Sequence, residues 1–174
     1  HIFLDDETPN ARAWFQNGRR YVGITSGLVH LIEFYFLNIF SIRGVLTEFP
    51  ESEKEEEVEP DKFAEGFFLD KMLKTAEFDK SAFNSPFRIP VRAPKSPLRR
   101  QLASLLATDA IEFILWHEIG HCFYEHTKIL NEVYGVQQDG MAEWVPECEL
   151  CEPRDARHLF ELQADSFALN ALCA

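Results

Sequence analysis

The chain has 174 residues, of which 46% are apolar and 16 are phenylalanine, so it can bury the core of one globular domain. Its formal charge of −12 argues against nucleic-acid binding by this domain, although a local basic patch is compatible with it. Four scattered cysteines are too few for a secreted disulfide scaffold, which favours the reducing cytoplasm. We expect one domain over residues 1–174 and, because the chain starts with His1, a piece of a longer protein.

The first predicted elements are a short strand and a helix. Arg19–Thr25 (RRYVGIT) has the β-prone residues of a strand, and Gly18 ends the turn before it. Thr25 or Ser26 can cap a helix that runs to about Ile42. The apolar run inside it, Gly27–Phe40, is too short to span a bilayer and carries polar residues, and the N-terminus does not resemble a signal peptide.

Two charged segments follow. Residues 48–61 hold eight acidic residues against one lysine, which is typical of a solvated, mobile loop, with an interaction tail for a basic partner as the alternative. Beyond them lies one basic patch, which is expected to be solvated or, alternatively, to contact a substrate or partner. It consists of Arg88, Arg92, Lys95, Arg99 and Arg100.

The remaining elements are predicted to be mainly helical. Phe63–Phe78 has helical apolar spacing, whereas the prolines of Ser85–Pro97 require an extended or looped segment. Ser96 and Pro97 form a favourable helix start, and the helix should end near Gly135. A last helix begins near Asp155.

The long helix carries HEIGH, which is an HExxH motif. His117 and His121 are four residues apart and therefore lie on one helix face, where their imidazoles can hold one Zn²⁺. Glu118 sits beside them and can take a proton from a water that the metal acidifies. Two histidines and a glutamate are rare on a buried helix unless they have partners, so we expect one zinc ion per chain.

A third histidine, His126, follows in the same stretch. On a straight helix it lies about 180° around from His117, because each residue turns the helix by about 100°. It should therefore face away from the metal and act as a solvent or packing histidine.

The last helix supplies candidates for the third ligand. Glu161 and Asp165 are four residues apart, and a cation between the helices would offset their repulsion. Glu161 can bind the metal while Asp165 accepts the N–H of a ligand histidine. The small residues Ala164 and Ala168 allow this helix to approach closely.

HEIGH followed by ELQADSFA resembles the HExxH…ExxxD signature of gluzincin peptidases. It is similar to that of HtpX/CAAX-prenyl-type peptidases, minigluzincins, ImmA/IrrE-type peptidases and phage-exclusion Lit-type peptidases. Pro9–Ile32 also resembles the segment that these families place upstream. The resemblance implies an α+β, helix-rich, zincin-like fold with a small sheet, whose edge strand borders the active-site helix and pairs with an extended substrate. That strand would contain Tyr21, Val22, Gly23 and Ile24.

The resemblance also implies the roles of the site residues. His117, His121 and Glu161 would bind zinc, Glu118 would be the general base, and Asp165 would orient a ligand histidine, His117 being favoured. Such families use a downstream histidine, tyrosine or arginine to stabilise the oxyanion. The candidates here are His158, Tyr134 and Arg157.

The cysteines leave several interpretations open. Cys148 and Cys151 form a CxxC without a second pair, which favours free thiols or a redox-sensitive pair over a structural zinc site. A thiol that occupies the catalytic zinc in a resting state is a further alternative. Cys122, beside the second histidine, is expected to be inert packing, with a redox role as the alternative.

Two functions follow from this pattern. The first is a zinc-dependent endopeptidase that cuts a protein or peptide substrate. The second is a latent or non-catalytic zinc-binding sensor or interaction domain, controlled by a regulatory partner domain.

Overall fold

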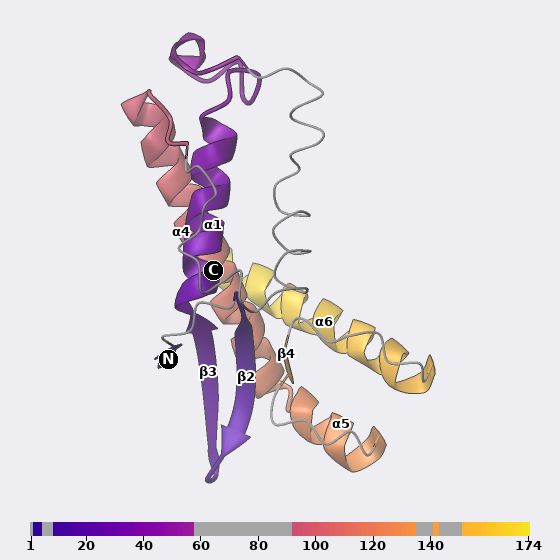
Figure 1. Ribbon diagram of the computed structural model, residues 1–174. Helices are drawn as coiled ribbons and strands as arrows, with labels where there is room; N and C mark the ends of the chain where they lie inside the picture. The colour runs from indigo at the N-terminus through magenta and orange to yellow at the C-terminus, as the bar shows by residue number, and fades with distance from the viewer. Residues whose placement is uncertain (1, 5–8, 58–91, 135–140, 143–150) are drawn as a thin grey trace. The chain divides into compact units, whose positions relative to one another are not determined.

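The computed structural model describes residues 2–4, 9–57, 92–134, 141–142 and 151–174. It is a helix-rich α+β structure, as predicted (Figure 1). The chain divides into two compact units: His1–Leu28 with Ile111–Ala174, and Val29–Ala110. The assignment of residues 1–174 to one domain stays a prediction. Among the described residues, no helix has the length and apolar character that crossing a bilayer requires.

The first unit contains a small mixed sheet. Its strand order is β1-β3-β2-β4, with β1 parallel to β3 and with β2 antiparallel to both β3 and β4. The strands are β1 (Ile2–Leu4), β2 (Ala11–Gln16), β3 (Arg19–Thr25) and β4 (Met141–Ala142).

The β2–β3 hairpin forms around a two-residue turn. Asn17 and Gly18 have φ angles of 53° and 73°, the left-handed conformations that a type I′ hairpin turn requires and that Asn-Gly adopts readily. Across the hairpin Trp14 pairs with Tyr21, and their rings stack with centroids 5.4 Å apart. The bounds of β3 match the prediction, whereas β2 is not among the predicted elements.

The position of β3 in the sheet corrects one prediction. β1 pairs with Gly23, Ile24 and Thr25 on one side of β3, and β2 pairs with Arg19 to Ile24 on its other side. The expectation of an edge strand is therefore wrong at Gly23 and Ile24, whose backbone is occupied on both sides. Within the described part of the sheet, Tyr21 and Val22 are paired with β2 alone.

Thr25 links the sheet to the first helix, α1 (Ser26–Phe40). Its hydroxyl accepts hydrogen bonds from the backbone N–H of Asn10 at 2.8 Å and of Leu28 at 3.3 Å. The second bond satisfies one of the free N–H groups of the first helical turn, so Thr25 acts as the N-cap. The predicted end at Ile42 lies two residues beyond the observed one.

In the second unit, described residues of the acidic segment contact described residues of the basic segment. Glu55 is only 3% exposed, and its carboxylate accepts the backbone N–H groups of Lys95 and Ser96, each at 2.9 Å. Glu56 forms ion pairs with Arg92 at 3.5 Å and with Lys95 at 3.7 Å. The expectation of a solvated loop is therefore wrong at Glu55. A short 3-10 helix, η1 (Ser52–Lys54), lies in the same segment.

Arg99 is also misplaced in the predicted basic patch, because its side chain is fully buried. Its guanidinium donates to four backbone carbonyls and lies 3.9 Å from the Glu55 carboxylate. The acceptors are the carbonyls of Phe40, Ile42, Val45 and Leu46. Arg99 thus neutralises a buried carboxylate and provides hydrogen-bond donors to the backbone carbonyls at the end of α1 and in the turn that follows it.

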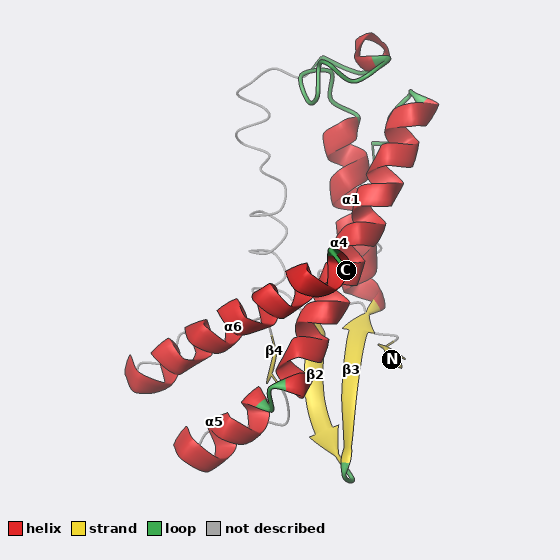
Figure 2. Cartoon of the chain, turned by 180° about the vertical axis from the view of Figure 1, so that it is seen from behind, coloured by secondary structure: helices red, strands yellow, loops and turns green. Residues whose placement is uncertain are grey.

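The other long helices are α4 (Pro97–Phe123), α5 (His126–Tyr134) and α6 (Cys151–Leu172). The Ser96 hydroxyl accepts the N–H of Arg99 at 3.3 Å, which confirms the predicted cap of α4. The helix that was predicted to run to about Gly135 is instead two helices, because Tyr124 and Glu125 form a turn that separates α4 from α5 (Figure 2). Glu125 there has a left-handed φ of 57°. The predicted Phe63–Phe78 helix and Cys148 lie outside the described residues.

Candidate metal centre

The C-terminal part of α4 carries three polar side chains on its buried side. His117, Glu118 and His121 are 6%, 1% and 2% exposed. Helical periodicity places the two histidines one turn apart, and their Nε2 atoms lie 2.9 Å from each other. Both rings therefore present the same nitrogen to one point.

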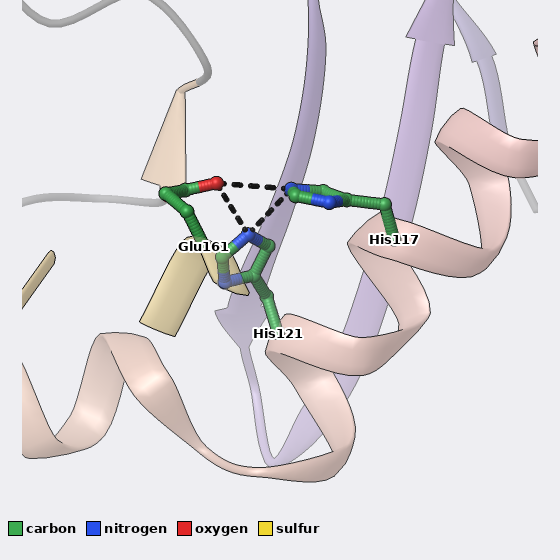
Figure 3. A group of neighbouring side chains, drawn as sticks. All are labelled: His117, His121 and Glu161. Carbon is green, nitrogen blue, oxygen red and sulfur yellow. Dashed lines mark hydrogen bonds and ion pairs between the residues drawn. The ribbon is translucent and has the colours of Figure 1, made fainter. Parts of the chain in front are cut away.

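Glu161 on α6 completes this group, 40 residues farther along the chain. Its Oε2 lies 3.0 Å from Nε2 of His117 and 3.3 Å from Nε2 of His121. Figure 3 shows the carboxylate facing both imidazole rings. These three residues form a group in which each offers one donor atom within 4.8 Å of the others, suited to a metal ion.

The chemistry of these donors fits zinc. Two imidazole nitrogens and one carboxylate oxygen form a donor set of catalytic zinc sites, in which water takes the fourth position. Ligand atoms at about 2.1 Å from a tetrahedral metal are about 3.4 Å from each other. The observed separations of 2.9, 3.0 and 3.3 Å are slightly shorter than that value. The three residues therefore fit a zinc ion if their donor atoms move slightly apart.

A close approach of α4 and α6 makes this geometry possible. A Cβ added at Gly120, inside the HEIGH motif, would lie 3.1 Å from the Cα of Ala164. Ala164 and Ala168 are fully buried. Small residues on both helices thus let the backbones come near enough for Glu161 to reach the histidines.

Asp165 lies one turn beyond Glu161 and contacts the other nitrogen of His117, with Oδ1 2.9 Å from Nδ1. Burial alone would lower the pKa of His117, but the bond to Glu161, the charges of Glu118 and Glu161, and the bond to Asp165 raise it to about 9. Burial would raise the pKa of Glu161, yet its bonds to His117 and His121 lower it to about 2. The neighbouring carboxylates thus favour the protonated form of the His117 ring.

His126 does not face away from this group, contrary to the straight-helix prediction. The turn at Glu125 redirects the chain, so that Nδ1 of His126 lies 2.8 Å from Nδ1 of His121. Its side chain is fully buried. On its other side, Nε2 lies 3.0 Å from Oε1 of Gln163 on α6. His126 was expected on the opposite side because no glycine or proline marks the break, and Gln163 is not among the predicted site residues.

The other predicted site residues are more peripheral. His158 is exposed on α6 and Arg157 is half-buried, while Tyr134 is the last residue of α5. Cys122 is half-buried, and its Sγ lies 3.6 Å from the carbonyl of Tyr21. Burial and the nearby charge of Glu118 raise the pKa of the Cys122 thiol, which favours packing over thiolate reactivity.

A groove of about 490 Å³ opens beside His121. Strand residues Ala13, Trp14, Phe15 and Arg20 line one part of it, and residues of the α4–α5 turn and α5 line the rest. Arg20 bonds to Glu125 across this groove and ties the hairpin to the turn. The first unit thus combines the donor group with an adjoining concave surface.

Comparisons with known proteins add one finding. The family model described as Peptidase U49 matches residues 81–174, more than half of the chain, including HEIGH and the whole of α6. No curated protein and no solved structure matches the chain. The chain therefore belongs to the peptidase U49 family.

Proposed function

We propose that this peptidase is a zinc-dependent endopeptidase of the gluzincin type. One observation carries the proposal: His117, His121 and Glu161, brought together from two helices, converge with three donor atoms. The peptidase family supports the reaction class, namely hydrolysis of a peptide bond. The donor set and the neighbouring Glu118 support the metal and the mechanism.

In this proposal each residue has a distinct task. His117, His121 and Glu161 hold the ion, and Asp165 orients the His117 ring. A bound zinc ion would supply Lewis acidity, lowering the pKa of a water and polarising the scissile carbonyl. Glu118 takes the proton from the attacking water and delivers it to the leaving amide nitrogen. Because Glu118 is 1% exposed, its carboxylate acts in a site of low solvent screening.

The substrate is proposed to lie in the groove beside His121. Trp14 and the 64% exposed Phe15 offer apolar surface there, beside the ion pair of Arg20 and Glu125. β4 pairs with β2 at Arg12 and Ala13. Within the described sheet, the outer backbone edge of β2 beyond Ala13 is open for an extended peptide. This arrangement replaces pairing with Gly23 and Ile24 of β3, which β1 occupies.

The test uses the full chain loaded with zinc and a proteome-derived peptide library, with new N-termini read by mass spectrometry. Glu118→Gln should retain one zinc per chain and lose cleavage, whereas Glu161→Ala should bind zinc more weakly. Cleavage that persists in Glu118→Gln would contradict the role of the general base. One zinc per chain with no cleavage by the wild type would favour the sensor alternative.

A further inference from the structure

The buried His126 side chain is a feature that the proposed mechanism does not use. Its Nδ1 lies 2.8 Å from Nδ1 of His121, on the opposite side of that ring from the donor group. The His126 ring is stacked on Phe160, with centroids 4.4 Å apart, and on Tyr124 at 5.6 Å. Packing on these two rings restricts the orientation of the imidazole.

Hydrogen-bond chemistry fixes the tautomers of this chain of groups. If Nε2 of His121 binds a metal, the proton of that neutral ring resides on Nδ1, which donates to Nδ1 of His126. His126 then carries its own proton on Nε2, which donates to Oε1 of Gln163 at 3.0 Å. Each nitrogen has one partner and no charge is required.

We propose that His126 is a positioning residue for His121, and that Gln163 on α6 in turn orients His126. The proposal rests on the zinc function proposed above. It gives His121 a hydrogen-bond partner away from the metal, as Asp165 is for His117. Gln163 and Asp165 lie at the two flanks of the α6 face whose middle holds Phe160, Ala164 and Ala168. The single helix α6 thus provides a proposed ligand, the partner of His117 and, through His126 of α5, an indirect support for His121.

The direct test is the protonation pattern of the rings. The full chain, ¹⁵N-labelled at histidine and loaded with one zinc ion, is examined by long-range ¹H–¹⁵N NMR, with assignments from single variants. His121 should carry its proton on Nδ1, and His126 should be neutral with its proton on Nε2. A zinc-loaded protein in which His126 is doubly protonated, or protonated on Nδ1 alone, overturns this inference. A wild type that does not bind zinc overturns the proposed function and this inference with it.

Variants test whether the contact affects the metal. His126→Leu should lower zinc affinity by roughly 10- to 100-fold, the usual effect of removing an outer partner of a ligand. His126→Asn, whose side-chain oxygen can accept the His121 proton, should recover most of that loss. Gln163→Leu replaces an exposed residue and should preserve the fold. It should lower zinc affinity less than His126→Leu does. In NMR spectra of this variant, His126 should no longer appear as a single tautomer.

Leu130→Ala is the matched control for packing. Leu130 lies in the same buried cluster as Phe160, but its side chain offers no hydrogen bond to His121. The Leu130→Ala substitution should lower the thermal midpoint of unfolding and leave zinc affinity at 25 °C unchanged. Wild-type zinc affinity in His126→Leu, or an equal loss in Leu130→Ala, would show that His126 serves packing alone and would overturn the inference.

Discussion

At the residue scale, the two histidines of the proposed metal site have different hydrogen-bond partners. Asp165 gives Nδ1 of His117 a carboxylate partner at 2.9 Å, whereas Nδ1 of His121 faces the His126 ring at 2.8 Å. A carboxylate partner makes an imidazole more basic and a better metal donor. Asp165 is half-exposed and therefore can be replaced without opening a cavity in the core.

Asp165→Ala is expected to lower zinc affinity by roughly 10- to 100-fold, because His117 loses the acceptor that sets its tautomer and basicity. Competition with a chromophoric chelator at fixed pH measures the change. Ser166→Ala is the control, since that exposed hydroxyl donates within α6, to the carbonyl of Leu162 at 2.9 Å. Equal affinities of Asp165→Ala and Ser166→Ala would refute the orienting role.

At the element scale, the site depends on how closely α4 approaches α6. Gly120 supplies the space, since a Cβ there would lie 3.1 Å from the Cα of Ala164 and 3.3 Å from the Cβ of Phe167. Both contacts involve atoms that a rotamer change cannot move. A large side chain at position 120 must therefore shift the α6 backbone, and Glu161 with it.

Gly120→Leu should weaken zinc binding and lower the thermal midpoint, because it separates Glu161 from the histidines. Gly44→Leu is the matched control, since a Cβ at Gly44 meets no atom within 4 Å. Zinc titration and thermal melts of both variants provide the measurement. Wild-type zinc affinity in Gly120→Leu would show that the helix approach does not control the site.

A second element, the start of α4, depends on a buried charge in the second unit. Arg99→Met should lower the free energy of unfolding by about 3–5 kcal/mol, the usual effect of leaving a buried carboxylate such as Glu55 without its partner. The neighbouring Arg100 is exposed, so Arg100→Met should change the free energy of unfolding by less than about 0.5 kcal/mol. Urea denaturation of the two variants compares them. A small effect of Arg99→Met would indicate that the local backbone relaxes and hydrates the carboxylate.

At the scale of the whole molecule, the metal would act as a cross-link in the first unit. The HEIGH helix and Glu161 are about 40 residues apart in sequence, and a shared ion ties them only in the folded state. A ligand that binds the native state alone stabilises it by mass action. The thermal stability of the protein should therefore report on the site directly.

Free zinc at 100 times its dissociation constant should stabilise the chain by about 2.7 kcal/mol and raise the thermal midpoint. A chelator should reverse the shift, which differential scanning calorimetry can follow. Glu161→Ala should show a much smaller shift, whereas His158→Ala should respond like the wild type, because His158 is exposed and outside the donor group. A lost response in His158→Ala would assign the shift to another site.

The sequence by itself determined what depends on one or two turns of backbone. Helical periodicity places His117 and His121 on one face, Ser96 and Pro97 begin α4, and the bounds of β3 follow from its composition. Spacing on α6 likewise pairs Glu161 with Asp165. These features were predictable because local geometry repeats regularly from residue to residue.

Only the tertiary structure decided the contacts between segments that are distant in sequence. Packing buries Glu55 and Arg99, which charge alone assigns to the surface, and places β3 between β1 and β2. The left-handed Glu125 ends α4 and turns His126 toward His121. One left-handed backbone torsion changes the direction of the chain that follows it. The angular position of a residue around a helix therefore cannot be extrapolated beyond a helix end that no glycine or proline marks.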